Sequence, residues 1–370
     1  MSTVRDLRPT WAEIDLGAFT RNVDAVMRRL PQGSKLIAVL KADAYGHGAV
    51  ELARRCSPDR VAMIATALLE EALELRAARI ALPLLVLGPL TEAQISNALD
   101  HDVTIGVVGP EELESVCRIA RKRDVVIHLK LDSGMGRMGI LETELPRAIE
   151  LVRSAPRLRI EAIYTHFANA GDPDDPYTAQ QTQTFDRLLK MLRSAGIESA
   201  KHHLANSAAT MRGLVSAGDF VRIGLSLYGG EPLDRGSSRL EPVMRWRTEI
   251  ARLKDLPSGS AVGYGMTFHT SRASRIATLP VGYADGYSRL HSNNGEVLVR
   301  GKRAPVVGRV SMDLVTIDVT DLDARFGDEV VLLGSQGKER ITPEELATRT
   351  NTISHEVFCR VSRRVPRLYR

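Results

Sequence analysis

Short apolar runs recur through the first 230 residues, and most of them end in a polar residue or a glycine. Between them lie segments with charged faces and apolar residues three or four positions apart, such as 68–79 and 110–121, which is typical of helices packed outside a sheet. This alternation predicts an α/β fold, a (β/α)8 TIM barrel. The eight predicted strands are 35–41, 60–67, 83–88, 103–108, 125–132, 158–166, 202–206 and 220–227.

The pattern changes after about residue 240 to β-rich segments separated by Gly, Pro, Ser and Asn turns, with one short candidate helix at 343–349. We therefore predict a barrel domain over 11–240 and a mostly β domain over 241–370. The length of 370 residues also favours two domains, because one core usually stops growing at ~250 to 300 residues. The alternating opening segment, 10–16, is a candidate strand of the second domain. The other strands predicted there are 276–282, 296–300, 305–310, 314–319 and 329–333.

Composition excludes several classes of protein. Hydrophobic residues make up 44% and charged residues 26%, which is typical of a globular protein. No apolar run reaches the ~20 residues of a membrane span, and the N-terminus lacks a signal peptide, so we expect a cytoplasmic protein with no membrane partner. The net charge of +5 comes from basic residues interspersed with acids, which argues against a nucleic-acid partner. Three cysteines without CxxC spacing predict neither disulfides nor a metal site.

Lys41 carries the most informative chemistry, because it ends an apolar strand just before an aromatic residue and two glycines. An ammonium in apolar surroundings loses hydration, so its pKa falls and the amine can form an imine with an aldehyde cofactor. Pyridoxal phosphate is held in this way. An isolated lysine is more often a surface residue, and the rest of the chain decides between the two interpretations.

Other polar residues also fall where the predicted strands end, and a barrel enzyme works at that end. The loops after the seventh and eighth strands often bind phosphate, where Ser207 offers a hydroxyl and Gly224 and Leu225 offer backbone N–H groups. Convergence from separate strands is hard to obtain by chance. The residues concerned are Lys41, Lys130, Asp132, Arg137, His166, Asn206, Ser207, Arg222 and Gly224.

Four motifs, AVLKADAYGHG, LKLDSGMGRMG, HLANSAA and LPVGYADGY, closely resemble those of the alanine racemase family, and the resemblance runs from residue 11 to the C-terminal VPRLY. It implies a pyridoxal-phosphate-dependent racemase that acts on a small amino acid. It also implies a barrel, a C-terminal β domain and a head-to-tail homodimer whose sites are shared between subunits. The D-alanine product would supply bacterial cell-wall peptidoglycan.

The resemblance assigns the two catalytic bases. Lys41 would form the imine and act on the D face of the α-carbon, while Tyr264 of the neighbouring subunit would act on the L face. A free tyrosine, with a pKa of ~10, is a poor base at neutral pH. In the family a hydrogen-bond path through His166 to Arg222 answers this difficulty, because positive neighbours favour the phenolate.

The resemblance also assigns binding residues. Arg222 would face the pyridine nitrogen and, being permanently charged, would keep that nitrogen unprotonated. Arg137 would hold the phenolic oxygen of the cofactor and the substrate carboxylate. Lys130, often carbamylated in the family, and Asp313 would orient Arg137. The remaining assignments are phosphate contacts by Tyr45, Ser207, Gly224, Leu225 and His355, a backbone amide of Met312 for the carboxylate, and Tyr283 at the entrance.

One position departs from the family pattern. Where the family usually shows Thr-Ile-Asn-Tyr-Glu, this chain has Thr-Ile-Ser-His-Glu at 352–356, so His355 replaces a tyrosine that touches phosphate and crowds the substrate. Imidazole has a shorter reach and leaves room beside the substrate methyl, which predicts measurable turnover of serine beside alanine.

Two other functions compete with alanine racemisation and a broader serine or amino-acid racemase. One is a non-catalytic pyridoxal-phosphate carrier or regulator, which would need neither Tyr264 nor a second domain. The other is a dehydrogenase, because Gly134, Gly136 and Gly139 satisfy G-x-G-x-x-G after a strand. That fingerprint belongs in a first βα unit, whereas here it follows a fifth strand and encloses Arg137, so we disfavour it.

Overall fold

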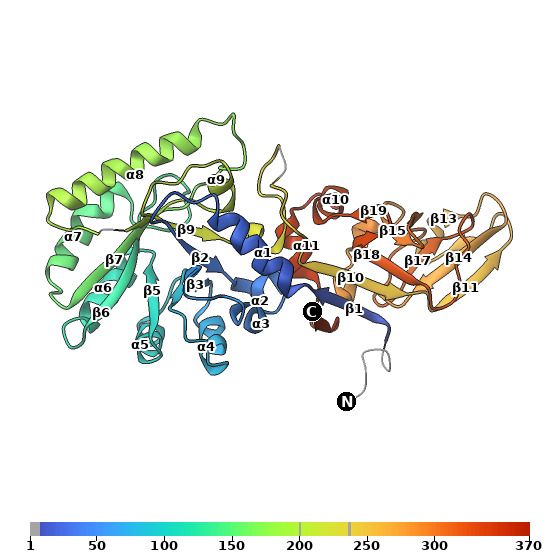
Figure 1. Ribbon diagram of the computed structural model, residues 1–370, viewed down its shortest axis with the longest axis horizontal. Helices are drawn as coiled ribbons and strands as arrows, with labels where there is room; N and C mark the ends of the chain where they lie inside the picture. Colours follow the sequence, from blue (N-terminus) through green and yellow to red (C-terminus); the bar gives the residue numbers. More distant parts are fainter. Residues whose placement is uncertain (1–7, 200, 236–237) are drawn as a thin grey trace.

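The first part of the chain forms a parallel barrel in the computed structural model, which describes residues 8–199, 201–235 and 238–370 (Figure 1). The sheet order is β8-β7-β6-β5-β4-β3-β2-β9, so the strands pair in sequence order and β9 returns to pair with β2. Strands of this kind are buried on both faces, which explains their continuous apolar sequences. Their bounds are β2 Lys35–Val39, β3 Val61–Thr66, β4 Leu84–Val86, β5 Val103–Val107, β6 Val125–Lys130, β7 Leu158–Tyr164, β8 His202–His203 and β9 Phe220–Ile223.

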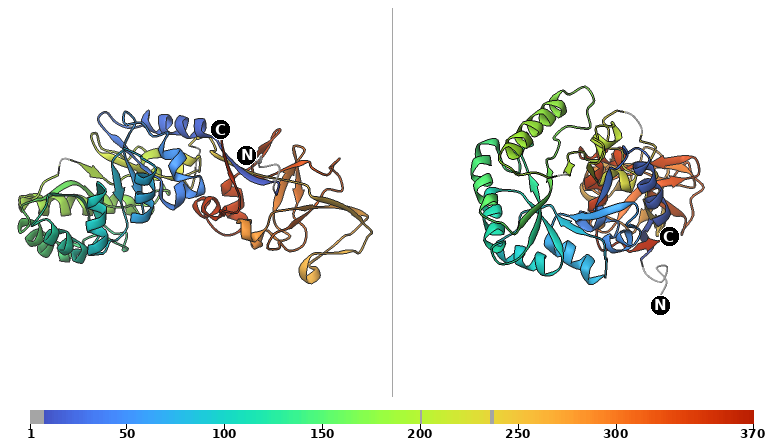
Figure 2. Two further views of the ribbon diagram at one scale, coloured as in Figure 1. Left: turned by 90° about the horizontal axis from the view of Figure 1, so that it is seen from below. Right: turned by 60° about the vertical axis from the view of Figure 1, so that its left-hand side comes forward.

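Helices surround this barrel, as the end-on view shows (Figure 2). The barrel is nearly closed, because β8 and β9 share no ladder, although the backbone N–H of Arg222 donates to the Ala205 carbonyl across the gap at 2.9 Å. The predicted barrel is thus confirmed. The helices are α1 Leu16–Met27, α2 Lys41–Gly46, α3 Ala49–Ala53, α4 Leu69–Ala77, α5 Glu92–Asp100, α6 Pro110–Ile119, α7 Leu145–Arg153, α8 Tyr177–Ser194 and α9 Ser207–Met211. None of the helices in the described ranges is long and apolar enough to cross a membrane.

The C-terminal part is mostly β and lies beside the barrel in Figure 1. Its main sheet has the order β16-β15-β18-β10-β1-β20, with β19 paired to β18, and it includes the N-terminal strand β1, Thr10–Ile14. Strand β1 pairs antiparallel with β10 and parallel with β20, so both ends of the chain meet in one sheet. The other strands of that sheet are β10 Met244–Glu249, β15 Glu296–Val299, β16 Lys302–Pro305, β18 Glu329–Gln336, β19 Glu339–Ile341 and β20 Arg367–Tyr369.

Two smaller sheets and two short helices complete this part. One sheet has the order β11-β14-β17 and the other pairs β12 with β13. The expected strand at 305–310 is wrong, because pairing with β15 ends at Pro305 and Val306 makes only an isolated bridge to Ile317. The elements are β11 Arg252–Leu256, β12 Ala261–Val262, β13 Phe268–His269, β14 Ser274–Leu279, β17 Val315–Asp318, α10 Pro343–Arg349 and α11 Ser354–Arg360.

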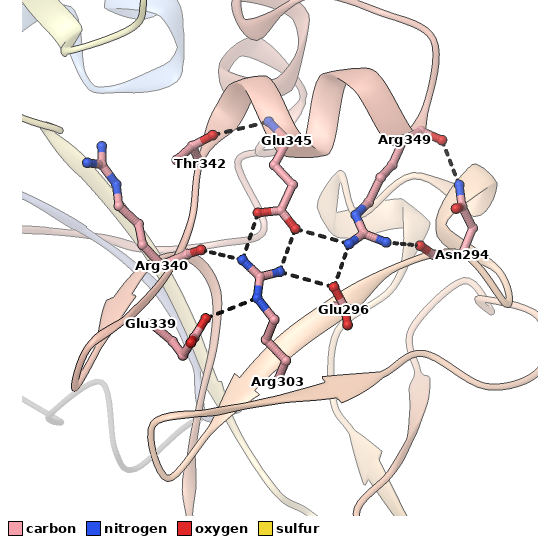
Figure 3. A network of polar contacts seen from close by, with 8 residues as sticks. All are labelled: Asn294, Glu296, Arg303, Glu339, Arg340, Thr342, Glu345 and Arg349. Atoms are coloured by element: carbon pink, nitrogen blue, oxygen red, sulfur yellow. Dashed lines mark hydrogen bonds and ion pairs between the residues drawn. The ribbon is translucent and has the colours of Figure 1, made fainter. Parts of the chain in front are cut away.

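An ion-pair network fixes α10 to the main β-sheet (Figure 3). Arg303 of β16 lies at its centre and donates to Glu345 of α10 at 2.6 and 3.0 Å, to Glu296 at 3.0 Å and to Glu339 at 3.1 Å. Arg349 adds a second guanidinium, 3.1 Å from Glu345. The network matters for function because Ala347 and Thr348 of α10 line the cavity described next.

Candidate active site

A cavity of about 880 Å³ opens at the C-terminal ends of the barrel strands and is closed on one side by α10 and α11. The polar residues at strand ends meet there because parallel strands present these ends at one face of a barrel. Of the residues predicted for the site, those that line this cavity are Lys41, Tyr45, Lys130, Arg137, His166, Asn206, Ser207, Arg222, Gly224, Leu225 and His355.

Lys41 begins α2, a segment with an unusual backbone. Residues Ala42 to Tyr45 have φ of 52–54°, a left-handed turn that costs L-residues roughly 1–2 kcal/mol each. Glu71 helps to hold the turn, since its carboxylate accepts from the N–H of Ala42 at 2.6 Å and of Ala67 at 2.9 Å. Strain of this kind persists where surrounding structure over-determines it, often at functional sites. Here it places Lys41 and Tyr45 in the same cavity.

Ser207, Gly224 and Tyr45 form a compact polar corner. The Ser207 hydroxyl oxygen accepts from the backbone N–H of Gly224 at 3.2 Å and of Ser226 at 3.5 Å. The Tyr45 ring packs against Gly224 and lies 4.7 Å from the Tyr228 ring. Burial raises the pKa of Tyr45, so its phenol stays protonated and able to donate. The corner therefore offers the Ser207 and Tyr45 hydroxyls as donors of the type that bind phosphate.

Arg222 is buried on β9 and places a positive charge inside the barrel, at the cavity. Its guanidinium donates to the carbonyls of Thr165 at 2.7 Å and Leu204 at 3.2 Å and to Nδ1 of His166 at 3.1 Å. Burial lowers the pKa of Arg222 to about 10, which still leaves it charged at neutral pH. Burial and the Arg222 charge together lower the pKa of His166, so that imidazole is neutral.

Burial and the neighbouring positive charges lower the pKa values of the two lysines in the cavity. Burial, followed by the charges of Arg222 and Arg137, lowers the pKa of Lys130 to about 8. Burial, followed by Arg137, also lowers the pKa of Lys41, in the direction expected from its apolar strand. Cations that depress each other's pKa favour an anionic occupant. The Lys130 ammonium also lies 5.9 Å from the centre of the Tyr164 ring.

The glycine-rich loop after β6 is organised by Asp132 rather than by a ligand. Its carboxylate accepts from the backbone N–H groups of Gly134 at 2.9 Å, Met135 at 2.8 Å and Gly136 at 2.9 Å. Pyrophosphate binding by G-x-G-x-x-G needs such N–H groups at a helix N-terminus. Here they are already occupied, and the loop presents Arg137 to the cavity instead.

His355 on α11 lines the cavity beside the phosphate-type corner. Its ring centre lies 5.5 Å from that of Tyr45. Burial and Lys41 lower the pKa of His355, which favours the neutral imidazole. The preceding residue, Ser354, donates to Glu344 of α10 at 3.0 Å, so the two helices are fixed to each other at the cavity.

Four predicted site residues lie elsewhere, on the C-terminal β part, and do not line this cavity: Tyr264, Tyr283, Met312 and Asp313. Tyr264 is 72% exposed and Met312 53% exposed. Tyr283 lies next to Met312 in the fold, since the N–H of the following residue, Ala284, donates to the Met312 carbonyl at 3.0 Å. Asp313 forms an ion pair with Arg364 at 2.6 Å rather than with a cavity residue.

Sequence reasoning missed several polar residues around Arg222. Tyr164 stacks against His203 with ring centres 4.5 Å apart, and Arg222 lies 5.4 Å from the Tyr164 ring centre. His128 and His203 are fully buried in the barrel. In the sequence, each of these two appears only as a histidine within an apolar strand. Such a histidine is more often a core residue with its hydrogen bonds satisfied, and the sequence does not reveal its partners.

The fold and cavity define a barrel enzyme with a buried lysine and arginine cluster at the strand ends. The N-terminal domain model of alanine racemase matches residues 14–232, and the C-terminal domain model matches residues 243–369. The chain therefore belongs to the alanine racemase family, and it is an isomerase of that type. The resemblance seen in the motifs is confirmed, and the dehydrogenase hypothesis is wrong.

Individual relatives agree along the whole chain. The alanine racemase of Halothermothrix orenii is 43% identical over 372 residues, covering 99% of this chain and 98% of the relative. The crystal structure of Bacillus anthracis alanine racemase with bound L-Ala-P superposes with a TM-score of 0.91 at 37% identity, covering 98% and 95%. The Bartonella henselae alanine racemase with covalently bound pyridoxal phosphate superposes with a TM-score of 0.89 at 28% identity, covering 98% and 100%.

Proposed function

We propose that this protein interconverts L-alanine and D-alanine with pyridoxal phosphate by a two-base mechanism. The observation that carries the proposal is the meeting of Lys41, Arg137, Arg222 and the Ser207–Gly224 corner in one cavity, within a chain that matches the family from end to end. The proposed use of D-alanine, the supply of cell-wall peptidoglycan from the cytoplasm, follows from the family.

The cavity fits the chemistry of this cofactor. The hydroxyls of Ser207 and Tyr45 offer the polar groups that a phosphate needs, at a corner that Gly224 helps to form. Lys41 is an amine with a lowered pKa at the mouth of the barrel, and Arg222 lies deep inside. When bound, pyridoxal phosphate supplies the electron sink that makes the α-hydrogen of an amino acid acidic.

The chain's own residues would then bind the substrate and move its proton. Arg137 would hold the carboxylate, and Nζ of Lys41 would take or return the proton on one face of the α-carbon. The hydroxyl of Tyr264 would do so on the other face. His166, which accepts a hydrogen bond from Arg222 at 3.1 Å, would lie beside this hydroxyl. Through His166 the positive charge of Arg222 would favour the phenolate form of Tyr264.

Tyr264 reaches a cavity only if a second copy of the chain supplies it, which favours a head-to-tail homodimer. Large apolar side chains on the C-terminal β part are exposed, Tyr264 at 72% and Met266 at 64%. Large apolar side chains are also exposed at the mouth of the barrel cavity, Leu68 at 55% and Ile353 at 61%. Apolar patches of this type usually mark protein interfaces.

Incubation of the purified enzyme and pyridoxal phosphate with L-alanine in D2O tests the proposal. We expect D-alanine carrying deuterium at Cα, because each base exchanges its proton with solvent. Bound cofactor without D-alanine and without deuterium incorporation would overturn the proposal.

A second candidate activity, racemisation of serine, is favoured by His355. The imidazole at this wall of the cavity is shorter than a tyrosine and is neutral. Space beside the substrate methyl would then accept a hydroxymethyl group. The same experiment with L-serine tests it, and robust alanine turnover without any D-serine would remove the idea.

A further inference from the structure

Arg222 is a buried cation with no carboxylate among its hydrogen-bond partners in the described part of the chain. Besides carbonyl oxygens, its guanidinium contacts two imidazoles, Nδ1 of His203 at 2.8 Å through one nitrogen and Nδ1 of His166 at 3.1 Å through another. A buried charge needs compensation from its surroundings. A hydrogen-bonded route from Arg222 to an anion runs through His203.

That route is a continuous chain of hydrogen bonds. Nε2 of His203 lies 3.0 Å from Nδ1 of His128, and Nε2 of His128 lies 3.3 Å from the Glu161 carboxylate. Glu161 in turn lies 3.3 Å from the Lys201 ammonium, which directly precedes β8. The chain therefore links Arg222, which lines the cavity, to the half-buried Glu161 in the middle of β7.

The chemistry of the groups fixes the direction of every bond in this chain. A guanidinium only donates, so Nδ1 of His203 must accept, and a neutral imidazole then carries its hydrogen on Nε2. This hydrogen leaves Nδ1 of His128 as an acceptor, and the Nε2–H of His128 donates to the carboxylate. Burial and the positive charge of Arg222 lower the pKa of both histidines, which keeps them neutral.

The groups packed around the chain hold it in place. The Tyr164 ring stacks on His203 with an interplanar angle of 5°, and Phe220 contacts His203 and His128 edge-on and face-on. Bonding to His128 is the largest cause that lowers the pKa of Glu161, to about 2, and Lys201 adds to it, so the carboxylate is ionised. His202 is the remaining titratable neighbour of His203.

We propose that Glu161 is a positioning residue for Arg222, acting through the one-way hydrogen-bond chain from Arg222 to His203, His128 and the Glu161 carboxylate. The same donor-only guanidinium makes Nδ1 of His166 an acceptor. The hydrogen of neutral His166 is therefore on Nε2, the ring nitrogen left free to donate to another group. A change at Glu161 would thus reach the active site without touching cofactor or substrate. The role in racemisation rests on the function proposed above, whereas the hydrogen-bond order does not.

The test is the tautomeric state of the three histidines, read from long-range 1H–15N spectra of the cofactor-bound enzyme with 15N-labelled histidine. We expect a single Nε2–H tautomer for His203, His128 and His166. A protonated Nδ1 on His203 would overturn the proposal, because it would face the Arg222 donor.

Glu161→Ala removes the acceptor at the end of the chain. We expect His203 to keep its Nε2–H tautomer, because Nδ1 must still accept from Arg222, whereas the Nε2–H of His128 loses its anionic acceptor and its 1H–15N resonance shifts. We also expect a roughly tenfold weaker affinity for pyridoxal phosphate, the effect of losing one charge-assisted hydrogen bond. Glu161→Gln keeps an acceptor oxygen and should restore most of both. Lys201→Met removes the exposed partner of Glu161 but leaves the chain intact, so its histidine spectrum should match that of the wild type.

An unchanged His128 Nε2–H resonance together with unchanged cofactor affinity in folded Glu161→Ala would overturn the positioning role. Should that variant fail to fold, His128→Asn provides the same test, since its amide oxygen still accepts from His203 but cannot reach Glu161. The function proposed above fails separately, by the absence of D-alanine with the wild-type enzyme, and that result leaves the tautomer assignment standing.

Discussion

The phenol ring of Tyr45 occupies the space that a side chain at Gly224 would need. A Cβ built on Gly224 would lie 3.1 Å from Cζ of Tyr45 and would meet the phenol oxygen still more closely. Tyr45 cannot easily withdraw, because it is buried and packed against Tyr228. Glycine at 224 and tyrosine at 45 therefore depend on each other, although 179 positions separate them in the sequence.

Gly224→Ala should weaken cofactor binding more than it weakens the fold. The added methyl would displace the Tyr45 phenol from the corner with Ser207. We expect the dissociation constant for pyridoxal phosphate, measured by titrating the cofactor-free enzyme, to rise about tenfold or more, as for the loss of one or two hydrogen bonds to a charged group. Gly109→Ala is the matched control, because a Cβ there meets nothing closer than 3.7 Å. Equal affinities in the two variants would contradict the packing argument.

Lys41→Ala and Tyr264→Phe should each abolish racemisation and should complement each other when mixed. Random reassociation makes half of the dimers mixed, and each mixed dimer has one site with both bases, so about a quarter of the wild-type activity should return. The measurement is D-alanine formation after the two inactive variants are co-expressed or exchanged. If mixed dimers form but show no activity, Tyr264 acts in the active site of its own chain.

His355→Tyr should narrow the cavity beside the substrate. The ratio of kcat/KM for serine to that for alanine should fall about tenfold, a typical discrimination for one small group in a tight pocket. His101→Tyr, at an exposed position where the imidazole contacts a helix carbonyl, is the control and should leave the ratio unchanged. A serine preference that is the same in both variants would remove His355 as the determinant.

Lys130 should make stability rise with pH in the cofactor-free enzyme prepared without bicarbonate. Its pKa is about 8 in the folded chain, against ~10.4 for an unperturbed lysine. Below pH 8 Lys130 is protonated in both the folded and the unfolded state, and the buried ammonium destabilises the fold to its full extent. Between the two pKa values the unfolded state binds more protons, so the free energy of unfolding increases with pH. Urea unfolding at several pH values should show this increase in the wild type and a smaller one in Lys130→Met; equal slopes would contradict it.

Arg303→Met should destabilise the C-terminal part of the protein. It removes the donor that joins Glu345 of α10 to Glu296 and Glu339 and leaves these carboxylates facing one another. We expect a loss of about 2–3 kcal/mol in the free energy of unfolding, measured with denaturant. Arg272→Met breaks an exposed pair with Asp321 and should cost under about 1 kcal/mol. A similar small loss in both variants would show that the network adds little.

The barrel could be predicted from sequence because its signal is local and repeated. Strands buried on both faces require continuous apolar residues, and the helices between them require a polar face, so every unit carries its own pattern. The C-terminal part was harder, since its strands are short and are paired over long sequence distances. Strand β10 was not predicted, because it is short and carries Arg245 and Arg247. Its partners, β1 and β18, lie far from it in the sequence.

By itself the sequence determined the barrel, the family and the list of chemically capable residues, because motifs and periodicity are properties of neighbouring positions. Only the tertiary structure decided which of those residues meet. It placed Lys41, Arg137, Arg222 and His355 around one cavity and left Tyr264 exposed and outside its lining. It also joined Arg222 to Glu161 through His203 and His128. Hydrogen bonds and charges act over a few ångströms of space, and distance along the chain carries no information about them.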